Sequence, residues 1–406
     1  MIWSVSWRNI WRNPVRSGVI IAAIAVGMFA GVFTTTFVKG WMNQRLEVGV
    51  ETEVSYIQVH HPRFSDNYDL KMSIENGKAI SEKILSIEGV DGASPRIVLQ
   101  SMVSSAETGT GVKIIGVEPE QEKTTSNLYT YISEGDYFES VSRNPVVIGQ
   151  KLAKKLNVKL HSKIVVTIQD ANGNITAGAF RICGIFDTGN NMFEEMNLFV
   201  RYSDLRNLIS MNEGIAHEIT VHLTGQDKLD RVKSEIAAAY PVLEVQTWKE
   251  VTPELGYLNE IGDMYTYIFT VIILLALGFG IVNTMLMVVL ERIKELGMLM
   301  AVGMAKLKVF GMIMLETVLL TLTGGVIGII LGVVLTMITS NSGIDLSMYA
   351  EGLEDMGYAA HIYPVLETKM VIIIAILVIL TGIIASVYPA RKALKYNPAD
   401  ALRIDM

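Results

Sequence analysis

Histidine, cysteine and carboxylate side chains would have to build any catalytic or metal site in this chain, and their spacing favours neither. The sequence has six histidines and a single cysteine, Cys183. His60 and His61 are neighbours, and His217 and His222 are five residues apart, so on a strand each pair points to opposite faces. No cysteine accompanies them at metal-ligand spacing. We interpret these histidines as core or surface residues, and Cys183 alone forms no internal disulfide.

The printed sequence also lacks the short motifs of phosphate binding and nucleophilic catalysis. It contains no G-x-x-x-x-G-K-[ST] loop and no G-x-S-x-G turn. We interpret the acidic run Glu118, Glu120 and Glu122 as a solvated loop. Because nucleic-acid binding needs a basic face, the net charge of −7 argues against such a partner. We therefore expect a non-catalytic chain that holds no cofactor or metal of its own.

Four apolar stretches are long enough to cross a bilayer, which takes about 20 mostly apolar residues. We place these spans at residues 17–40, 263–290, 309–338 and 370–390. The first is interpreted as a retained anchor, because its apolar run is too long for a usual signal peptide and no A-x-A-like site follows it. Apart from Glu316 the spans are nearly uncharged, whereas a polar permeation path would display intramembrane acids or bases.

Basic residues near the span ends predict the orientation. They gather in segments 1–16, 291–308 and 391–406, whereas the 339–369 connection has one basic residue against five acidic ones. We therefore predict that the first three segments are cytoplasmic. The large domain at residues 41–262 and the 339–369 loop then face the other side.

Residues 1–16 combine two stripes of four-residue spacing, one aromatic and one basic. On a helix these stripes lie side by side, which is typical of a helix in the membrane interface. Pro14 predicts a bend before the first span. A plain positively charged anchor without further role is equally consistent with the pattern. The stripes are Trp3, Trp7 and Trp11, and Arg8, Arg12 and Arg16.

The segment 41–262 shows alternating strand and helix patterns. Together with the four spans it predicts an α-helical membrane protein with a large two-lobed α+β extracytoplasmic domain, whose second lobe starts near residue 145. We expect Val146–Val158 to form a short helix and Asn172-Gly173 to form a hairpin turn. Strands are predicted at 54–60, 93–104, 112–117, 163–170, 180–187, 218–223 and 244–248, and further helices at 75–87, 203–209 and 228–240.

A short charged and then apolar segment follows the second span. Its sequence is E-R-I-K-E-L-G-M-L-M-A-V-G (291–303), and Ile293, Leu296 and Met300 share one helical face. Such a helix suits a lever for a partner protein, while a simple interfacial loop is the alternative.

Four motifs carry a family resemblance. The 291–303 segment resembles the E-R-x-x-E-I-G-x-L-R-A-[IL]-G signature of FtsX/MacB-type ABC transporter permeases, from which Met298 and Met300 depart. Trp7–Ser17, Val146–Val158 and Tyr388–Arg403 resemble the family's opening, periplasmic and closing motifs. Within this superfamily, S-Y-I-Q-V-H-H-P-R-F (55–64) is similar to the lipoprotein-releasing LolC/LolE permeases.

The resemblance implies a subunit in the bacterial inner membrane that pairs with a second permease and two copies of a separate ABC ATPase, where ATP and Mg²⁺ bind. ATPase closure would move the 291–303 helix and, by mechanotransmission, the external lobes. Lipoprotein cargo would pass to a periplasmic chaperone; drug or peptide efflux, or signalling to a cell-wall hydrolase, is the alternative function. The predicted coupling residues are Glu291, Arg292, Glu295, Leu296, Gly297, Met300 and Gly303.

Three further groups in the spans have predicted roles. Glu316 is expected to pair with an N-terminal arginine, with Arg12 as the candidate, and to fix the first helix; a transmission contact is the alternative. Gly324, Gly328 and Gly332 permit close helix packing, either within the chain or against the second permease. The candidate acyl-chain cavity is lined by Val32, Phe33, Ile273 and Leu277, although these could equally be lipid-facing surface.

Overall fold

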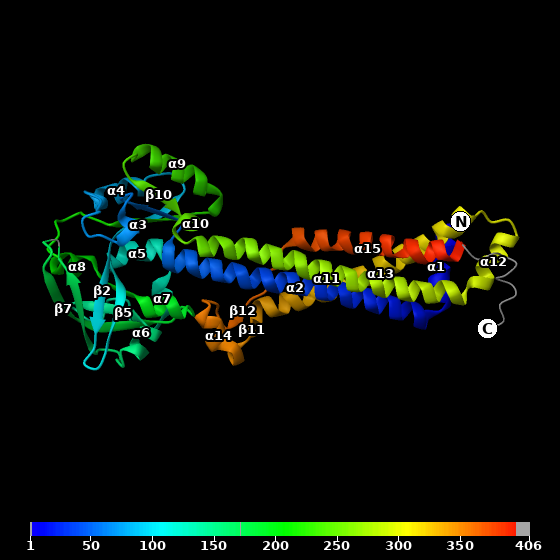
Figure 1. Ribbon diagram of the computed structural model, residues 1–406, viewed down its shortest axis with the longest axis horizontal. Coiled ribbons are helices and arrows are strands. Elements are labelled where there is room, and N and C mark those ends of the chain that lie inside the picture. The colour runs from blue at the N-terminus through cyan, green and yellow to red at the C-terminus, as the bar shows by residue number, and fades with distance from the viewer. Residues whose placement is uncertain (1, 171, 395–406) are drawn as a thin grey trace. The chain divides into compact units, whose positions relative to one another are not determined.

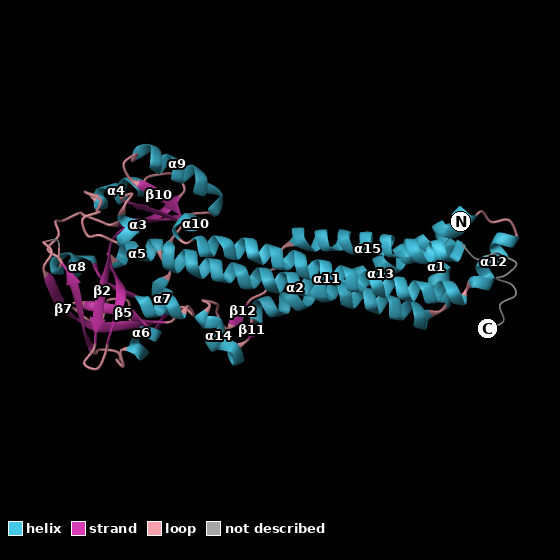
Figure 2. Ribbon diagram, viewed as in Figure 1, coloured by secondary structure: helices cyan, strands magenta, loops and turns pink. Residues whose placement is uncertain are grey.

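The computed structural model describes residues 2–170 and 172–394, and it divides into two units. A helical unit holds the chain up to residue 41, residues 261–344 and the chain from 362 onward. An α+β unit holds residues 42–260 and 345–361. Figures 1 and 2 show both, with the strands confined to the second unit apart from the ends of one short pair.

Four long helices in the described residues are apolar and long enough to cross a membrane. They are α2 (Pro14–Val48), α11 (Pro253–Glu291), α13 (Lys306–Ser342) and α15 (Thr368–Leu394). Each contains one predicted span and extends beyond it. A chain of this length and apolarity forms a helix in lipid because every backbone hydrogen bond must be made within the segment.

Two short helices flank these spans. Helix α1 (Ile2–Arg12) ends just before Pro14, which starts α2, since proline is well tolerated in the first turn of a helix. Helix α12 (Ile293–Ala301) follows α11, and the chain turns back at Gly303, whose φ of +103° is unfavourable for other residues. The part of the predicted tail beyond residue 394, with most of the Tyr388–Arg403 motif, lies outside the described residues.

The glycine stripe of α13 packs on α2 of the same chain. A Cβ built on Gly328 would lie 2.5 Å from the carbonyl oxygen of Ala25, and one on Gly332 would lie 2.9 Å from the side chain of Val32. Gly324 faces α2 one turn earlier, where a Cβ would lie 2.8 Å from a backbone oxygen. The two helix backbones approach closely only because these positions lack side chains. The structure therefore answers the open question: the stripe packs within the chain.

One ten-stranded sheet organises the α+β unit, in the order β10-β1-β9-β2-β3-β8-β5-β7-β4, with β6 joining β2 to β7. Its strands are β1 (Ile57–His60), β2 (Val90–Ser104), β3 (Gly109–Val117), β4 (Ile132–Gly135), β5 (Pro145–Gly149), β6 (Lys163–Gln169), β7 (Ile175–Phe186), β8 (Asn197–Arg201), β9 (Glu218–Leu223) and β10 (Glu244–Thr247). The helices of this unit are α3 (Phe64–Asn67), α4 (Gly77–Leu85), α5 (Pro119–Thr125), α6 (Gln150–Lys155), α7 (Asn191–Met196), α8 (Tyr202–Leu208), α9 (Leu229–Ala239), α10 (Trp248–Val251) and α14 (Ala350–Asp355). Two residues each form β11 (Ile344–Asp345) and β12 (His361–Ile362), a separate pair in the predicted 339–369 loop.

Strand β2 contributes to three hydrophobic cores, and two of these divide it along its length. Residues 90–96 pair with β9, and residues 97–104 pair with β3. The first core, beside the N-terminal half of β2, combines residues before 94 with residues after 218. The second core, beside the C-terminal half of β2, contains residues from Ile97 to Ile209. The predicted lobe boundary near residue 145 lies inside this second core. The chain enters and leaves this second core through β2 and the residues before β9, so the first core is split in sequence.

Three local predictions need correction. Val146–Val158 is not one helix: its β-branched start forms β5 and only 150–155 forms α6. The predicted 54–60 strand is preceded by a π-helical turn (Gly49–Val54) and begins at Ile57. Glu122 is buried rather than solvated, because α5 directs its carboxylate toward the buried Arg96, which it binds. The predicted hairpin is confirmed, since β6 and β7 pair antiparallel around 170–174.

Candidate functional site

Helix α12 presents one buried and one exposed apolar surface. Ile293 and Leu296 are 4% and 3% exposed and pack, with the partly buried Met300, against the core of the helical unit. On the other side Met298 is 55% exposed and Val302, just after the helix, is 84% exposed. Leu307, at the start of α13, is 80% exposed. We refer to Met298 in α12, Val302 directly after it and Leu307 at the start of α13 as the exposed apolar surface.

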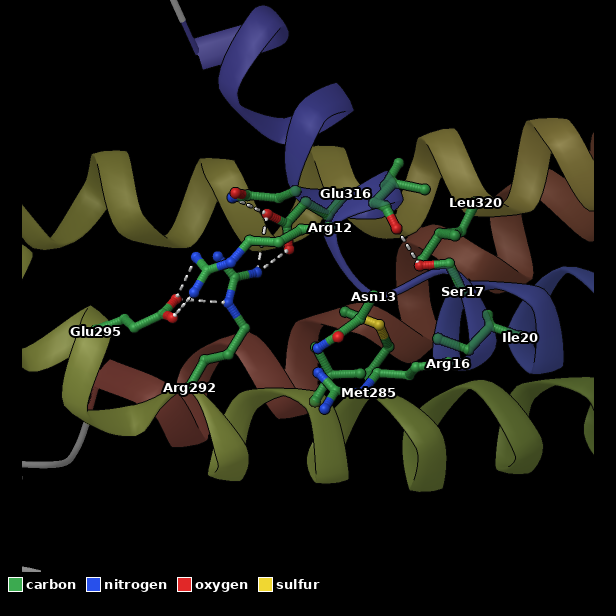
Figure 3. Close-up of a pocket in the computed structure, with 13 residues that line it drawn as sticks. Arg12, Asn13, Arg16, Ser17, Ile20, Met285, Arg292, Glu295, Glu316 and Leu320 are labelled. Atoms are coloured by element: carbon green, nitrogen blue, oxygen red, sulfur yellow. Dashed lines mark hydrogen bonds and ion pairs between the residues drawn. The ribbon is translucent and has the colours of Figure 1, made fainter.

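A network of ion pairs holds α12 to its neighbours (Figure 3). The guanidinium of Arg12 in α1 lies 2.5 Å from a carboxylate oxygen of Glu295. Arg292, between α11 and α12, donates to Glu295 at 3.0 Å and to both oxygens of Glu316 in α13 at 3.3 Å. Arg16 of α2 pairs with Glu291 at the end of α11. Four helices of the unit are therefore joined around α12 by charge.

The predicted pair of Arg12 with Glu316 is not the one that forms. Arg12 binds Glu295, and Glu316 binds Arg292 and accepts a hydrogen bond of 2.7 Å from the side chain of Asn9. The N-terminal helix is thus fixed to Glu316 through an amide instead of an arginine. The sequence could not give this pairing, because the position of Arg292 depends on the turn between α11 and α12.

Burial and charge distinguish the two carboxylates of the network. Glu316 is 5% exposed, so its charge is held in the packed helical unit by Arg292. Glu295 is more accessible: its partial burial raises its pKa, but hydrogen bonds from Arg292 and Arg12 outweigh this effect and lower the pKa overall. Both groups are therefore tied to the same arginine. A small cavity of about 60 Å³ lies beside the network, too small for a cargo molecule.

Seven coupling residues were predicted, and the structure places them together around α12. Glu291, Arg292 and Glu295 make the ion pairs, Leu296 and Gly297 are buried, Met300 packs partly on the core and Gly303 forms the exposed turn. The sequence missed Asn9 and Ser6, whose hydroxyl donates to the backbone of Met312. Their short polar side chains on the apolar side of α1 were the available signal.

The four candidates for an acyl-chain cavity do not share an exposed surface. Val32 is fully buried against Gly332, and Leu277 is 6% exposed and packs on Gly27. Phe33 stacks on Phe29 with a centroid distance of 6.1 Å. Val32 and Leu277 are therefore wrong as cavity-lining residues of this chain, because close helix packing already occupies their surfaces.

The described residues form no metal centre that could serve chemistry. Within residues 2–170 and 172–394, no three His, Cys, Asp or Glu side chains come together as a metal site needs. His60 instead hydrogen-bonds Gln246, and His217 stacks on Phe64 in the core. Burial lowers the pKa of His217 to about 4.

Comparison with known proteins follows the same division of the chain. Residues 17–239, more than half of the chain, match the family model of the MacB-like periplasmic core domain. Residues 267–398 match that of the FtsX-like permease C-terminal. The chain is 26% identical to the uncharacterized ABC transporter permease MJ1507 of Methanocaldococcus jannaschii, over 67% of this chain and 65% of that protein.

Two further relatives carry names that describe a function. The lipoprotein-releasing system transmembrane protein LolC of Neisseria meningitidis is 22% identical over 91% of this chain and 88% of its own length. The macrolide export ATP-binding/permease protein MacB of Escherichia coli is 26% identical over 57% of this chain and 34% of its own. A crystal structure of the periplasmic region of MacB from Actinobacillus actinomycetemcomitans covers 52% of this chain and 95% of that one, with 11% identity and a TM-score of 0.36. With both family models matched in the order that the fold requires, the chain belongs to the FtsX/MacB superfamily of ABC transporter permeases.

Proposed function

We propose that this chain is the transmembrane subunit of a LolCDE-type ABC transporter that releases lipoproteins from the bacterial inner membrane. ATP and Mg²⁺ would bind to two copies of a separate ATPase subunit, and a second permease chain would complete the transporter. LolC relatives that align with up to 91% of the chain support this assignment. The released cargo would pass to a periplasmic chaperone.

The observation that carries the proposal is the construction of α12. Burial of its exposed apolar surface against a partner protein would be favourable, because it removes apolar side chains from water. Its other side is fastened to α1, α11 and α13 by Arg12, Arg292, Glu295 and Glu316. A push on α12 would therefore move these helices together instead of bending a loose loop.

The helical unit provides a continuous route for that motion. The ion pair of Glu316 with Arg292 connects α13 to the start of α12. The glycine stripe packs α13 directly on α2, so the two helices have little space to move relative to each other. Closely packed interiors transmit displacement because they compress little. This mechanotransmission needs no channel for cargo through the spans.

The orientation proposed from the basic residues fits the same mechanism. The segments 1–16, 291–308 and 391–406 would face the cytoplasm, where the ATPase is. The domain at 41–262 and the 339–369 loop would face the periplasm, as the family name of the periplasmic core domain suggests. Efflux of a drug or peptide remains the second candidate, favoured by the 26% identity to MacB over 57% of the chain.

Reconstitution tests the assignment. The permease, the second permease chain, the ATPase and a radiolabelled triacylated lipoprotein are placed in liposomes, and a soluble lipoprotein chaperone is added outside. We expect ATP to transfer the lipoprotein to the chaperone, with no transfer when the catalytic glutamate of the ATPase is replaced. ATP hydrolysis without transfer, combined with ATP-driven export of a macrolide, would replace the lipoprotein assignment by the efflux one.

A further inference from the structure

A cavity of about 720 Å³ in the α+β unit has no role in the mechanism above. Residues of strands β2, β3 and β8 line it together with residues of helix α7. The end of α14 lines it too, through Asp355 and Met356. Its volume falls within the range of about 300–1,000 Å³ that is typical of small-molecule sites.

A row of polar side chains crosses three strands on this cavity. Gln100 of β2 is the register partner of Lys113 in β3, and Lys113 is the partner of Asn197 in β8. Residues in register point to the same face of a sheet. Two residues further along each strand, the same face of the sheet carries Val98, Ile115 and Phe199, which are buried. The hydrophobic core therefore stops where the polar row begins, and the cavity takes its place.

Two members of the row offer interactions that the protein does not use. Asn197 is only 5% exposed, and its amide nitrogen donates to Phe193 while its side-chain oxygen has no partner. Lys113 forms no ion pair with any carboxylate in the described part of the chain, and its ammonium lies 5.7 Å from the ring centroid of Tyr68. Burial lowers the pKa of Lys113. An anion beside it would restore the charged form that burial disfavours.

The cavity lining also contains three exposed apolar side chains. Met192 and Met196 are four residues apart on α7 and are 64% and 53% exposed, and Met356, directly after α14, is 73% exposed. Phe193 lies between the first two and is buried. Methionine side chains are flexible and polarizable, so they adapt to apolar groups of different shape.

The carboxylates that line the cavity are mostly occupied. Glu53 pairs with Arg45 at 3.1 Å and also accepts from Asn190, and Asp355 accepts from the amide of Asn191 at 2.5 Å. Glu254 adds one further negative charge on the rim. Lys113 is thus the cation of the lining that forms no ion pair in the described residues, although the charges of Glu218 and Glu53 act on it from a greater distance.

We propose that this cavity binds a small amphiphile whose anionic head lies at Lys113 and Asn197 and whose apolar chain lies along Met192, Met196 and Met356. Gln100 and Asn197 would supply hydrogen bonds to a hydroxyl or phosphate ester of the head. The site is separate from the α12 lever and does not depend on which cargo the transporter moves.

Methionine methyl resonances of the full-length permease in lipid nanodiscs provide the test, with octyl phosphate as the probe. We expect the ¹³C-methyl signals of Met192, Met196 and Met356 to shift in a saturable way. The control is Met102, which is 60% exposed on β2 but does not line the cavity, and its signal should stay unchanged. Equal shifts at Met102 would mean non-specific partitioning and would overturn the proposal.

Head-group recognition is tested with Lys113→Gln, with Lys163→Gln on β6 as a matched control outside the cavity. Lys113→Gln should weaken the binding of octyl phosphate at least about tenfold. Octanol lacks the anionic head, so its weaker binding should be the same in Lys113→Gln and in the wild type. The unshifted signals of the other methionines check that the variant is folded. Equal affinity for octyl phosphate and octanol, no effect of Lys113→Gln, or full binding of inorganic phosphate alone would each contradict the amphiphile site. So would saturable binding of a capped tripeptide when octyl phosphate does not bind.

Discussion

The guanidinium of Arg292 donates to both carboxylate oxygens of Glu316, each at 3.3 Å, and so joins the connection between α11 and α12 to the interior of α13. Glu316 is 5% exposed, so the pair lies in the packed part of the helical unit. A buried carboxylate that loses its arginine is left with an uncompensated charge, which is costly.

Glu316→Ala should destabilise the helical unit by about 1–3 kcal/mol, because Arg292 would keep only Glu295 as a partner and the amide of Asn9 would lose its acceptor. The exposed pair of Lys123 and Glu120 supplies the control, since Glu120→Ala should change stability by only about 0–1 kcal/mol. Thermal unfolding in nanodiscs measures both. Similar melting temperatures for the two variants would contradict a structural role for the Arg292–Glu316 pair.

The glycine stripe gives a sharper comparison. In Gly328→Ala the new methyl group would meet the backbone of Ala25, so we expect α2 and α13 to separate and transport to fall severalfold. Gly325→Ala is the matched control, because nothing lies within 4 Å of a Cβ at that position. Transport and melting temperature of the two variants should differ clearly. Equal behaviour would mean that the close approach is unimportant.

The exposed apolar surface should contact the ATPase. Val302→Asp and Leu307→Asp place a charge where a partner would bury an apolar side chain, so co-purification of the ATPase should drop at least about tenfold. Val242→Asp, at a site 76% exposed in the α+β unit, is the control.

Glu295→Arg should instead keep the ATPase bound but uncouple hydrolysis from transport. Full transport in this last variant would exclude α12 as the lever.

Thiol labelling tests the orientation. Cysteines placed at Asn172 and Asp345 should react with a membrane-impermeant reagent in intact spheroplasts, while one at Lys306 should react only after lysis. The buried native Cys183 contributes little background, because burial raises its pKa to about 11 and keeps it as the unreactive thiol. Labelling of the Lys306 position in intact spheroplasts would reverse the proposed orientation.

Glu194 predicts a pH dependence of stability. Burial raises its pKa to about 7, despite hydrogen bonds from the backbone of Thr188 and Gly189. Between about pH 4.5 and 7 the folded state holds this proton more tightly than the unfolded state, so stability falls as pH rises through that window. Glu194→Gln should remove this decrease and raise the melting temperature at pH 8 relative to wild type. An unchanged pH profile would contradict this assignment.

Long apolar runs and strand alternation carried most of the fold prediction. The four spans were predictable because about 20 apolar residues have few alternatives to a membrane helix, and β9 matches the predicted 218–223 strand. Helix α7 and strand β8 were missed because 191–201 mixes acidic, amide and apolar residues without a clear period. Val32 was misassigned, since composition does not tell which side of an apolar helix meets a glycine of its neighbour. The partner of Glu316 depends on the chain reversal at α12, which no local pattern specifies.

The division of β2 between two cores has a consequence for synthesis on the ribosome. The core between Ile97 and Ile209 is contiguous in sequence, so it can assemble as soon as that stretch has emerged. The other core joins residues near Val50 to residues near Leu255, and its halves must wait for each other until the whole insertion has been made. The N-terminal half of β2 would then remain without β9, its partner, for more than a hundred residues of translation. Nascent chains stalled so that residue 215 has just emerged from the ribosome should therefore show a protease-resistant fragment that begins near Ile97, while α4 and β1 are still digested.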